Sequence, residues 1–211
     1  MTKRTRILLK IPVWLACLTP WALLVSDSVT NRLGPDPTKS LIHSTGTAAL
    51  YLLMISLAIT PLRRLSPRLS WLIHFRRLLG LFAFFYGSLH LLCYVSLYAY
   101  FNPATVVTDV FQRKFIFVGM AAWALLVPLA ITSTTGWIRR LGGKRWNLLH
   151  KLVYLSVTLG LIHYWWQVKR GVLSPLPETI ALTLIFLARP LTAWWARRNQ
   201  SRAHSGPVPI P

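Results

Sequence analysis

Acidic residues are almost absent from this sequence. Its 211 residues include 4 Asp+Glu against 24 Lys+Arg, which gives a formal net charge of +20. Only 13% of the residues are charged and 54% are apolar, whereas charged residues make up about 25% of an ordinary soluble domain. This balance argues against a soluble globular enzyme and against a disordered tail.

Cysteine is also scarce. Cys17 and Cys93 both lie inside apolar runs, where a cysteine usually acts as a small hydrophobic residue. The sequence has no Cys-x-x-Cys-His motif and no Cys/His spacing typical of zinc. A disulfide scaffold, covalent c-type haem and a zinc finger are therefore not expected.

Long apolar runs take up more than half of the chain. A membrane-spanning helix needs about 20 mostly apolar residues. Six segments meet this requirement, at residues 8–26, 43–61, 78–101, 115–133, 147–166 and 178–196. The sequence thus predicts an all-α bundle of six transmembrane helices, with residues 1–200 as one membrane domain and 201–211 as a flexible tail. The connections are too short for a soluble domain.

The basic residues are distributed unevenly between the connections. Most of them lie at the N-terminus, after the second and fourth predicted spans, and at the C-terminal end. By the positive-inside rule, both termini and the tail are cytoplasmic. The first apolar run is interpreted as an uncleaved span rather than a signal peptide. The positive charge is explained by the basic residues of the cytoplasmic connections. We therefore expect contact with anionic lipid and no nucleic-acid partner.

None of the four acidic residues falls in the middle of a predicted span. Asp27, Asp36 and Asp109 lie at or beyond span ends, and Glu178 begins the sixth span. A proton-coupled transporter usually needs a carboxylate inside the membrane. The sequence therefore argues against that class.

Two histidines lie deep in different spans. His90 is in the third span and His163 in the fifth, at depths that differ by roughly 6 Å at 1.5 Å per residue. Haem iron in a helical bundle is bound by imidazoles from facing helices. Gly87 and Gly160 each precede a histidine by three residues, which would leave bare helix beside a porphyrin. The alternative is that these are helix-packing residues.

The other membrane histidines give weaker signals. His150 lies 13 residues before His163, a rise of about 20 Å, and could bind a second haem, although the two side chains would point about 140° apart on an ideal helix. His74 lies in a basic cluster and is expected at the membrane interface. His43, at the outer end of the second span, could border a haem or a quinone, or cap its helix.

Several motifs together resemble one family. They are Thr60–Arg63 (TPLR), Arg76–Leu81 (RRLLGL), Tyr86–His90 (YGSLH), Gly136–Gly143 (GWIRRLGG) and Trp146–Tyr154 (WNLLHKLVY). They resemble the MsrQ (YedZ) family, the haem-b membrane subunits of a periplasmic methionine sulfoxide reductase system. That family belongs to the ferric-reductase-like transmembrane group.

The resemblance implies a role and a set of ligands. It implies electron transfer from the quinone pool, or from a cytosolic flavin reductase, through haem b to a periplasmic molybdopterin subunit (MsrP-like) across the bacterial inner membrane. It also implies FMN in some members. The family's haem-iron ligands fall on His90, His150 and His163. The resemblance leaves a second bis-histidine site incomplete, because the position that would carry its histidine in the third span falls near Arg77. Whether the chain binds one haem or two therefore stays open.

Two other functions remain open at this point. The expected absence of a soluble domain leaves no NAD(P)H or FAD fold, so the chain could only relay electrons between separate molecules. A small transporter and an assembly or scaffold protein are the alternatives to a haem subunit. A visible spectrum separates them, because only bound haem gives a sharp α band on reduction.

Overall fold

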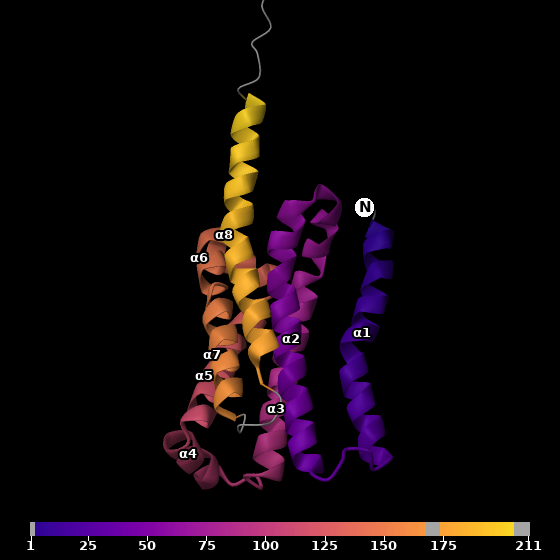
Figure 1. Ribbon diagram of the computed structural model, residues 1–211, viewed down its shortest axis with the longest axis vertical. Helices are drawn as coiled ribbons and strands as arrows, with labels where there is room; N and C mark the ends of the chain where they lie inside the picture. The colour runs from indigo at the N-terminus through magenta and orange to yellow at the C-terminus, as the bar shows by residue number, and fades with distance from the viewer. Residues whose placement is uncertain (1–2, 168–173, 205–211) are drawn as a thin grey trace, which may run out of the picture.

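Helices make up the fold throughout the described part of the chain. The computed structural model describes residues 3–167 and 174–204, with side chains for residues 8–66, 68–167 and 174–198. The elements are α1 (Lys3–Val29), α2 (Pro37–Leu65), the 3-10 helix η1 (Pro67–His74), α3 (Arg76–Leu97), α4 (Pro103–Gln112), α5 (Lys114–Ile131), α6 (Thr135–Leu149), α7 (Leu152–Gln167) and α8 (Leu176–His204). Figure 1 shows the long helices running side by side.

Five helices among the described residues are long and apolar enough to cross a membrane. They are α1, α2, α3, α5 and α8. The fifth predicted span corresponds to α7, which has 16 residues and falls short of that length. The all-α prediction is confirmed, and a multi-pass membrane bundle agrees with these five helices.

Three connections contain helices that the sequence interpretation left as loops: η1, α4 and α6. Gly142 interrupts α6 with a positive φ of 72°, a backbone conformation that favours glycine. The chain then turns at His150 and Lys151 before α7 begins. The predicted span at 147–166 therefore began too early, and His150 precedes α7 instead of lying within it.

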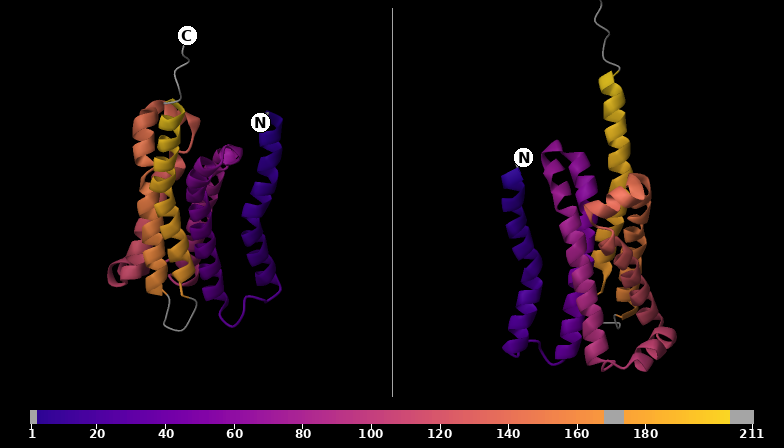
Figure 2. Two further views of the ribbon diagram at one scale, coloured as in Figure 1. Left: turned by 45° about the horizontal axis from the view of Figure 1, so that its top comes forward. Right: turned by 180° about the vertical axis from the view of Figure 1, so that it is seen from behind.

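Both ends of the described chain lie at the same end of the bundle. Figures 1 and 2 show that α1 begins and α8 ends there, together with α6. We call it the termini-bearing end. The α1–α2 connection and α4 lie at the opposite end. Helix α8 continues through residues 201–204 of the predicted tail, and residues 205–211 lie outside the described part of the chain.

The core lies between α2, α3, α5, α7 and α8. Helix α2 packs most closely on α3, and α5 on α7, while α8 lies against α2. Fully buried residues include Leu57, Ala83 and Val157. Apolar side chains are also exposed over the outer faces, such as Leu184 and Leu191 on α8. Such a surface suits lipid rather than water.

Helix α1 is held to the bundle through a buried tyrosine. Tyr86 on α3 is 0% exposed. Its Oη donates to the carbonyl of Cys17 at 2.7 Å and accepts from the N–H of Trp21 at 3.0 Å. Cys17 and Trp21 are four residues apart, so the phenol takes the place of one backbone hydrogen bond within α1. This insertion ties α1 to α3.

Candidate functional site

The two histidines that the sequence singled out lie together in the bundle. His90 on α3 and His163 on α7 have ring centroids 5.9 Å apart, with their planes at 86°. Both side chains are partly buried. The structure therefore brings together two imidazoles from two helices, as the depth argument expected.

Each imidazole is fixed by a backbone carbonyl on a neighbouring helix. The Nδ1 of His90 lies 2.8 Å from the carbonyl oxygen of Ile42 on α2. The Nδ1 of His163 lies 2.7 Å from the carbonyl oxygen of Phe115 on α5. A carbonyl only accepts, so each Nδ1 donates and carries the proton. Each Nε2 then keeps its lone pair free for a metal ion.

Two glycines that the sequence interpretation missed allow each imidazole to reach its backbone carbonyl. A Cβ built on Gly46 would lie 2.9 Å from His90 Nδ1, and one on Gly119 would lie 2.7 Å from His163 Nδ1. Real Cβ atoms essentially never come this close to another heavy atom. Any larger residue would push the imidazole away from its carbonyl.

The two halves of the site are built alike. Each histidine is 48 residues from the carbonyl that anchors it. In each case the glycine follows that carbonyl residue by one helical turn, as Gly46 follows Ile42 and Gly119 follows Phe115. The α2–α3 pair and the α5–α7 pair thus repeat one local arrangement. The equal separation is visible in the sequence, but it singles out these two glycines only once the helix pairs are known.

The glycines that the sequence did single out behave differently. A Cβ on Gly160 would meet nothing within 4 Å, and one on Gly87 would lie at an ordinary contact distance of 3.7 Å from Trp123. Gly160 therefore leaves space beside α7, as expected for a flat ligand. Gly87 allows α3 to pack against α5.

The two imidazoles fit the ligand set of a haem iron. Their ring centroids lie 5.9 Å apart, and each ring is bonded through Nδ1 to a carbonyl, so both Nε2 atoms are available to a metal ion. No group of three or more His, Cys, Asp or Glu is assembled among the described residues. A two-imidazole donor set suits a haem, whose porphyrin supplies the other ligands.

His150 lies apart from this pair, at the end of α6. Its ring stacks on Trp146, with centroids 3.8 Å apart, and its Nδ1 lies 3.1 Å from the Trp146 carbonyl oxygen. Trp146 in turn donates to the carbonyl of Thr132 after α5. The Nε2 of His150 is buried and has no hydrogen-bond partner. The structure gives His150 a fixed ring and a free nitrogen, but no facing histidine.

Arginines surround this part of the bundle. Arg189 on α8 lies over the ring of Tyr154 at 4.8 Å and donates to the carbonyl of Leu57, while its buried Nε has no partner. Arg64 donates to the carbonyl of Arg189. Arg76 begins α3 and acts electrostatically on both Arg189 and His150. No carboxylate pairs with them among the described residues. This cluster favours an anionic group.

The remaining histidines take separate places. His43 is exposed on α2, with its ring 5.7 Å from that of Tyr164, the neighbour of His163. It thus borders the His90–His163 pair, as one of its interpretations expected. His74 ends η1 and bonds to the Trp71 carbonyl. Neither ring joins the pair.

The interpretation of the acidic residues needs a correction. Glu178 is only 8% exposed and accepts a 2.6 Å hydrogen bond from Tyr51, about halfway along the 29-residue α2. Helix α8 begins against the middle of α2 rather than at its end. A carboxylate therefore does lie inside the bundle, and the argument against proton chemistry no longer holds.

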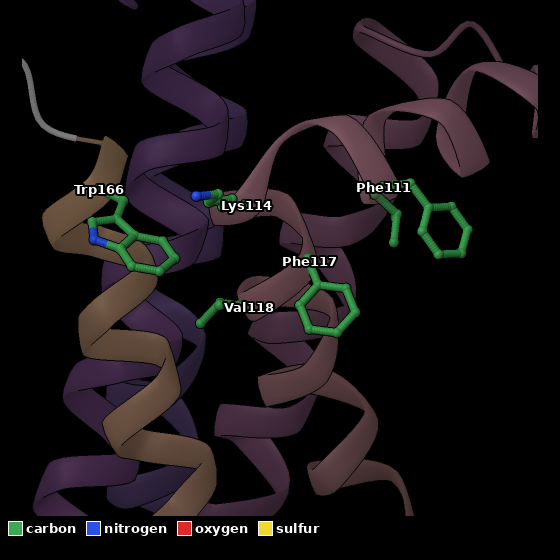
Figure 3. Close-up of a pocket in the computed structure, with 6 residues that line it drawn as sticks. Phe111, Lys114, Phe117, Val118 and Trp166 are labelled. Carbon is green, nitrogen blue, oxygen red and sulfur yellow. The ribbon is translucent and has the colours of Figure 1, made fainter.

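An open cavity of about 370 Å³ lies near the site but does not include its histidines. It is lined by Val110, Phe111, Lys114, Phe117, Val118 and Trp166. Figure 3 shows the aromatic rings of Phe117 and Trp166 on either side of Val118. The cavity opens on the outer surface of α5 and α7, so it is a surface depression rather than the histidine site.

Comparison with known proteins places the chain in a family. Residues 45–161, from α2 into α7, match the family described as ferric reductase like transmembrane component. The protein-methionine-sulfoxide reductase heme-binding subunit MsrQ of Ralstonia nicotianae is 44% identical over 203 residues, 95% of this chain and 93% of that protein. The chain belongs to the MsrQ family.

Other MsrQ proteins match over similar lengths. The subunit of Herminiimonas arsenicoxydans is 43% identical, covering 94% of this chain and 91% of its own length. That of Caulobacter vibrioides is 41% identical, covering 90% of this chain and 89% of its own. The MsrQ likeness therefore extends over α1 and α8 as well as the segment that contains His90 and His150.

Proposed function

We propose that this chain binds haem b between His90 and His163 and relays electrons through the membrane. The observation that carries this proposal is the pair of imidazoles 5.9 Å apart, each fixed through Nδ1 to a carbonyl on another helix. The MsrQ relatives support it, because their names describe heme-binding subunits. The chain would be an electron-transfer subunit rather than a catalytic one.

The protein contributes orientation and surroundings. When bound, the haem supplies an iron that accepts and gives up one electron. The carbonyls of Ile42 and Phe115 hold the proton of each ring on Nδ1, which leaves the lone pair of Nε2 to bind the iron that the two histidines would hold. Gly46 and Gly119 let each ring reach its carbonyl.

The proposed topology has six spans and cytoplasmic termini. Helix α7 packs along α5 and crosses most of the bilayer at about 1.5 Å per residue, so we count it with the five longer helices. The arginines at the end of α2, in η1 and at the start of α3 lie with those of α6 at the termini-bearing end, which agrees with the positive-inside rule. A reporter fused after Ala203 should be active only if its folding requires the cytoplasm. Periplasmic activity would overturn this topology.

The proposed partners lie on opposite sides of the bacterial inner membrane. The names of the relatives describe a protein-methionine-sulfoxide reductase. The acceptor would be its periplasmic molybdopterin subunit (MsrP-like), in a system that repairs oxidised proteins. It would dock beside the α3–α5 connection, where Tyr100, Phe101 and Phe111 are 80%, 66% and 80% exposed. Electrons would come from quinol or from a cytosolic flavin reductase.

The region of His150 is proposed as a second ligand site. The free Nε2 of His150 would bind the iron of a second haem nearer the termini-bearing end. Arg189, Arg64 and Arg76 would hold an anionic group there: a haem propionate, the phosphate of FMN, or a lipid headgroup. Because no second histidine faces His150, this site is expected to be weaker than the first.

The visible spectrum of the detergent-purified protein tests the proposal. Haem b with two histidine ligands gives a sharp α band on reduction, while a transporter or an assembly scaffold gives none. Membrane vesicles of known sidedness then test the direction of transfer. The haem should be reduced by quinol or reduced flavin and reoxidised by a periplasmic acceptor. Reoxidation only by acceptors on the cytoplasmic face would contradict an outward relay.

A further inference from the structure

One carboxylate stands apart from the other acids of the chain. Glu178 is buried, whereas Asp36 is exposed and Asp27 and Asp109 are partly exposed. It lies in the first turn of α8, yet its hydrogen-bond partner Tyr51 lies about halfway along α2. An ionisable side chain buried inside a membrane bundle is costly and usually functional.

Only half of this carboxylate is satisfied. Oε1 accepts the hydrogen bond from Tyr51 at 2.6 Å, and Oε2 is buried and has no hydrogen-bond partner in the described part of the chain. No Lys or Arg forms an ion pair with Glu178 among the described residues. A buried carboxylate normally has its acceptor oxygens bonded or its charge paired. Glu178 therefore has spare capacity to take up a proton.

A second tyrosine–carboxylate pair provides the contrast. Tyr94 donates to Asp109 Oδ2 at 2.7 Å, and Arg113 pairs with Asp109 Oδ1 at 3.1 Å. Both oxygens of Asp109 are thus used, and the pair lies at the end of the bundle that carries α4. Its bonds account for a structural role. The same account fails for Tyr51–Glu178, where one oxygen and the charge have no partner within residues 3–167 and 174–204.

The surroundings define the ligand that would use this pair. Tyr51 is 48% exposed on the outer face of α2, so its phenol is open to a molecule arriving from the lipid. Tyr164 interacts electrostatically with Glu178, has its ring tilted at 55° to that of His43 at 5.7 Å, and directly follows His163. A ligand here must dissolve in the membrane, donate a hydrogen bond and reach the neighbourhood of the histidine pair. A hydroquinone has all three properties.

We propose that Tyr51 and Glu178 are the proton-accepting pair of a binding site for a membrane-soluble hydroquinone, which is the electron donor. This inference rests on the haem relay proposed above. In each step an O–H bond of the hydroquinone breaks and its proton passes to Tyr51 Oη, while Tyr51 passes its own proton to Glu178. One electron would leave the hydroquinone at the same time, for the haem that His90 and His163 would hold. Before the second step, Glu178 would release its proton to water and the haem would pass its electron to the acceptor. The pair could then take the second proton, and the haem the second electron, as the quinone forms.

The experiment follows haem reduction in lipid nanodiscs after addition of decyl-ubiquinol. Tyr51→Phe removes the hydroxyl, and Glu178→Gln keeps an oxygen that accepts from Tyr51 but cannot take up the proton. We expect each variant to slow reduction at least about tenfold, which is a change of roughly 1.4 kcal/mol in the barrier. Tyr94→Phe and Asp109→Asn are the matched controls and should leave the rate unchanged. Dithionite should reduce the haem to the same spectrum in all five proteins.

A second measurement does not depend on haem reduction. Trp165 donates to Thr179, the neighbour of Glu178, so its fluorescence should report a ring bound nearby. Decyl-ubiquinone should quench wild-type fluorescence saturably, with a component that is lost in Trp165→Phe and weakened in Tyr51→Phe. Absence of that component contradicts the site.

The outcomes separate this inference from the function on which it rests. If the wild-type haem is reduced by reduced flavin but not by decyl-ubiquinol, the hydroquinone site is wrong and the relay stands. Wild-type rates in both Tyr51→Phe and Glu178→Gln also overturn it. If the protein binds no haem, the relay fails, and the fluorescence measurement alone decides whether the quinone binds.

Discussion

The α2–α3 pair and the α5–α7 pair hold their histidines in the same way, but they differ nearer the termini-bearing end. At the level of His90 and His163 both pairs have a histidine, an anchoring carbonyl and a glycine. Nearer the termini-bearing end, the second pair has His150, whereas the first has Arg77, which is exposed. A two-imidazole site forms where both pairs carry the same residues, and only half a site forms where they diverge.

The pairs also differ in what covers them. Tyr86 ties α1 to α3 by replacing a backbone hydrogen bond. Arg189 of α8 reaches both α2, through the Leu57 carbonyl, and α7, through the Tyr154 ring. The two-fold likeness is therefore confined to the region around the histidines. Substitutions at matching positions in the two pairs test how far the likeness extends.

The largest effect is expected from the histidines themselves. His90→Ala and His163→Ala should each abolish most haem binding, because one remaining axial imidazole leaves a five-coordinate, weakly held haem. Haem content is measured from the visible spectrum of purified protein. His74→Ala is the control, and its spectrum should match the wild type. Full low-spin haem in His163→Ala would make His150 the partner of His90.

The glycines should give the next largest effect, and an equal one in both pairs. In Gly46→Ala and Gly119→Ala the new Cβ would displace the imidazole. Overpacking of this kind costs about 1–3 kcal/mol, and each 1.4 kcal/mol lowers haem affinity roughly tenfold. Titration of the purified protein with haemin measures that affinity.

Gly160→Ala is the matched control for the glycine substitutions, because its Cβ would enter open space. It lies on the same helix as His163 and should leave the affinity close to wild type. A strong loss in only one of Gly46→Ala and Gly119→Ala would show that the two halves of the site are not equivalent.

Removal of the tie between α1 and α3 should affect stability more than haem binding. Tyr86→Phe removes both hydrogen bonds that join α3 to α1, and the Trp21 N–H can then bond the Cys17 carbonyl within α1, so we expect a cost of about 1 kcal/mol. The midpoint of thermal unfolding in detergent should fall, as followed by circular dichroism. Tyr98→Phe, at an exposed tyrosine, should leave it unchanged. An unchanged midpoint in Tyr86→Phe would mean that α1 does not need this bond.

The apolar runs were sufficient to predict the long helices and the pairing of two histidines, but not η1, α4 or α6. A helix of about 20 apolar residues is dictated by composition, and depth along it follows from the rise per residue. His90 and His163 could therefore be placed at similar depths before the structure was known. Their exact neighbours could not, because Gly46 and Gly119 act across helices, and one sequence does not show which helices touch.

His150 and Glu178 were misplaced for a related reason. The sequence interpretation continued the fifth span through His150, but the chain turns there before α7 begins. It placed Glu178 at a membrane surface, since the residue starts its span. Helix α8 begins against the middle of α2, so the residue is buried. The level at which a helix starts depends on packing, which apolar run length does not encode.

The smallest spectral change is expected from His150→Ala. This substitution tests the region nearer the termini-bearing end, where the α2–α3 pair and the α5–α7 pair differ. The pair formed by His90 and His163 would keep its haem, because His150 precedes α7 and lies apart from that pair. Its ring stacks on Trp146. Any second haem would be lost, so total haem should fall by at most about half, and reduction from the termini-bearing side should slow. Haem-to-protein ratio and reduction by reduced flavin measure these effects.

The single variant Arg77→His tests the converse, with the double variant Arg77→His/His150→Ala as its control. If a facing histidine is all that the second site lacks, haem content should rise in the single variant and not in the double variant. Equal haem content in these two proteins would show that the exposed position of residue 77 cannot face His150, and that the repeat ends at the level of the first site.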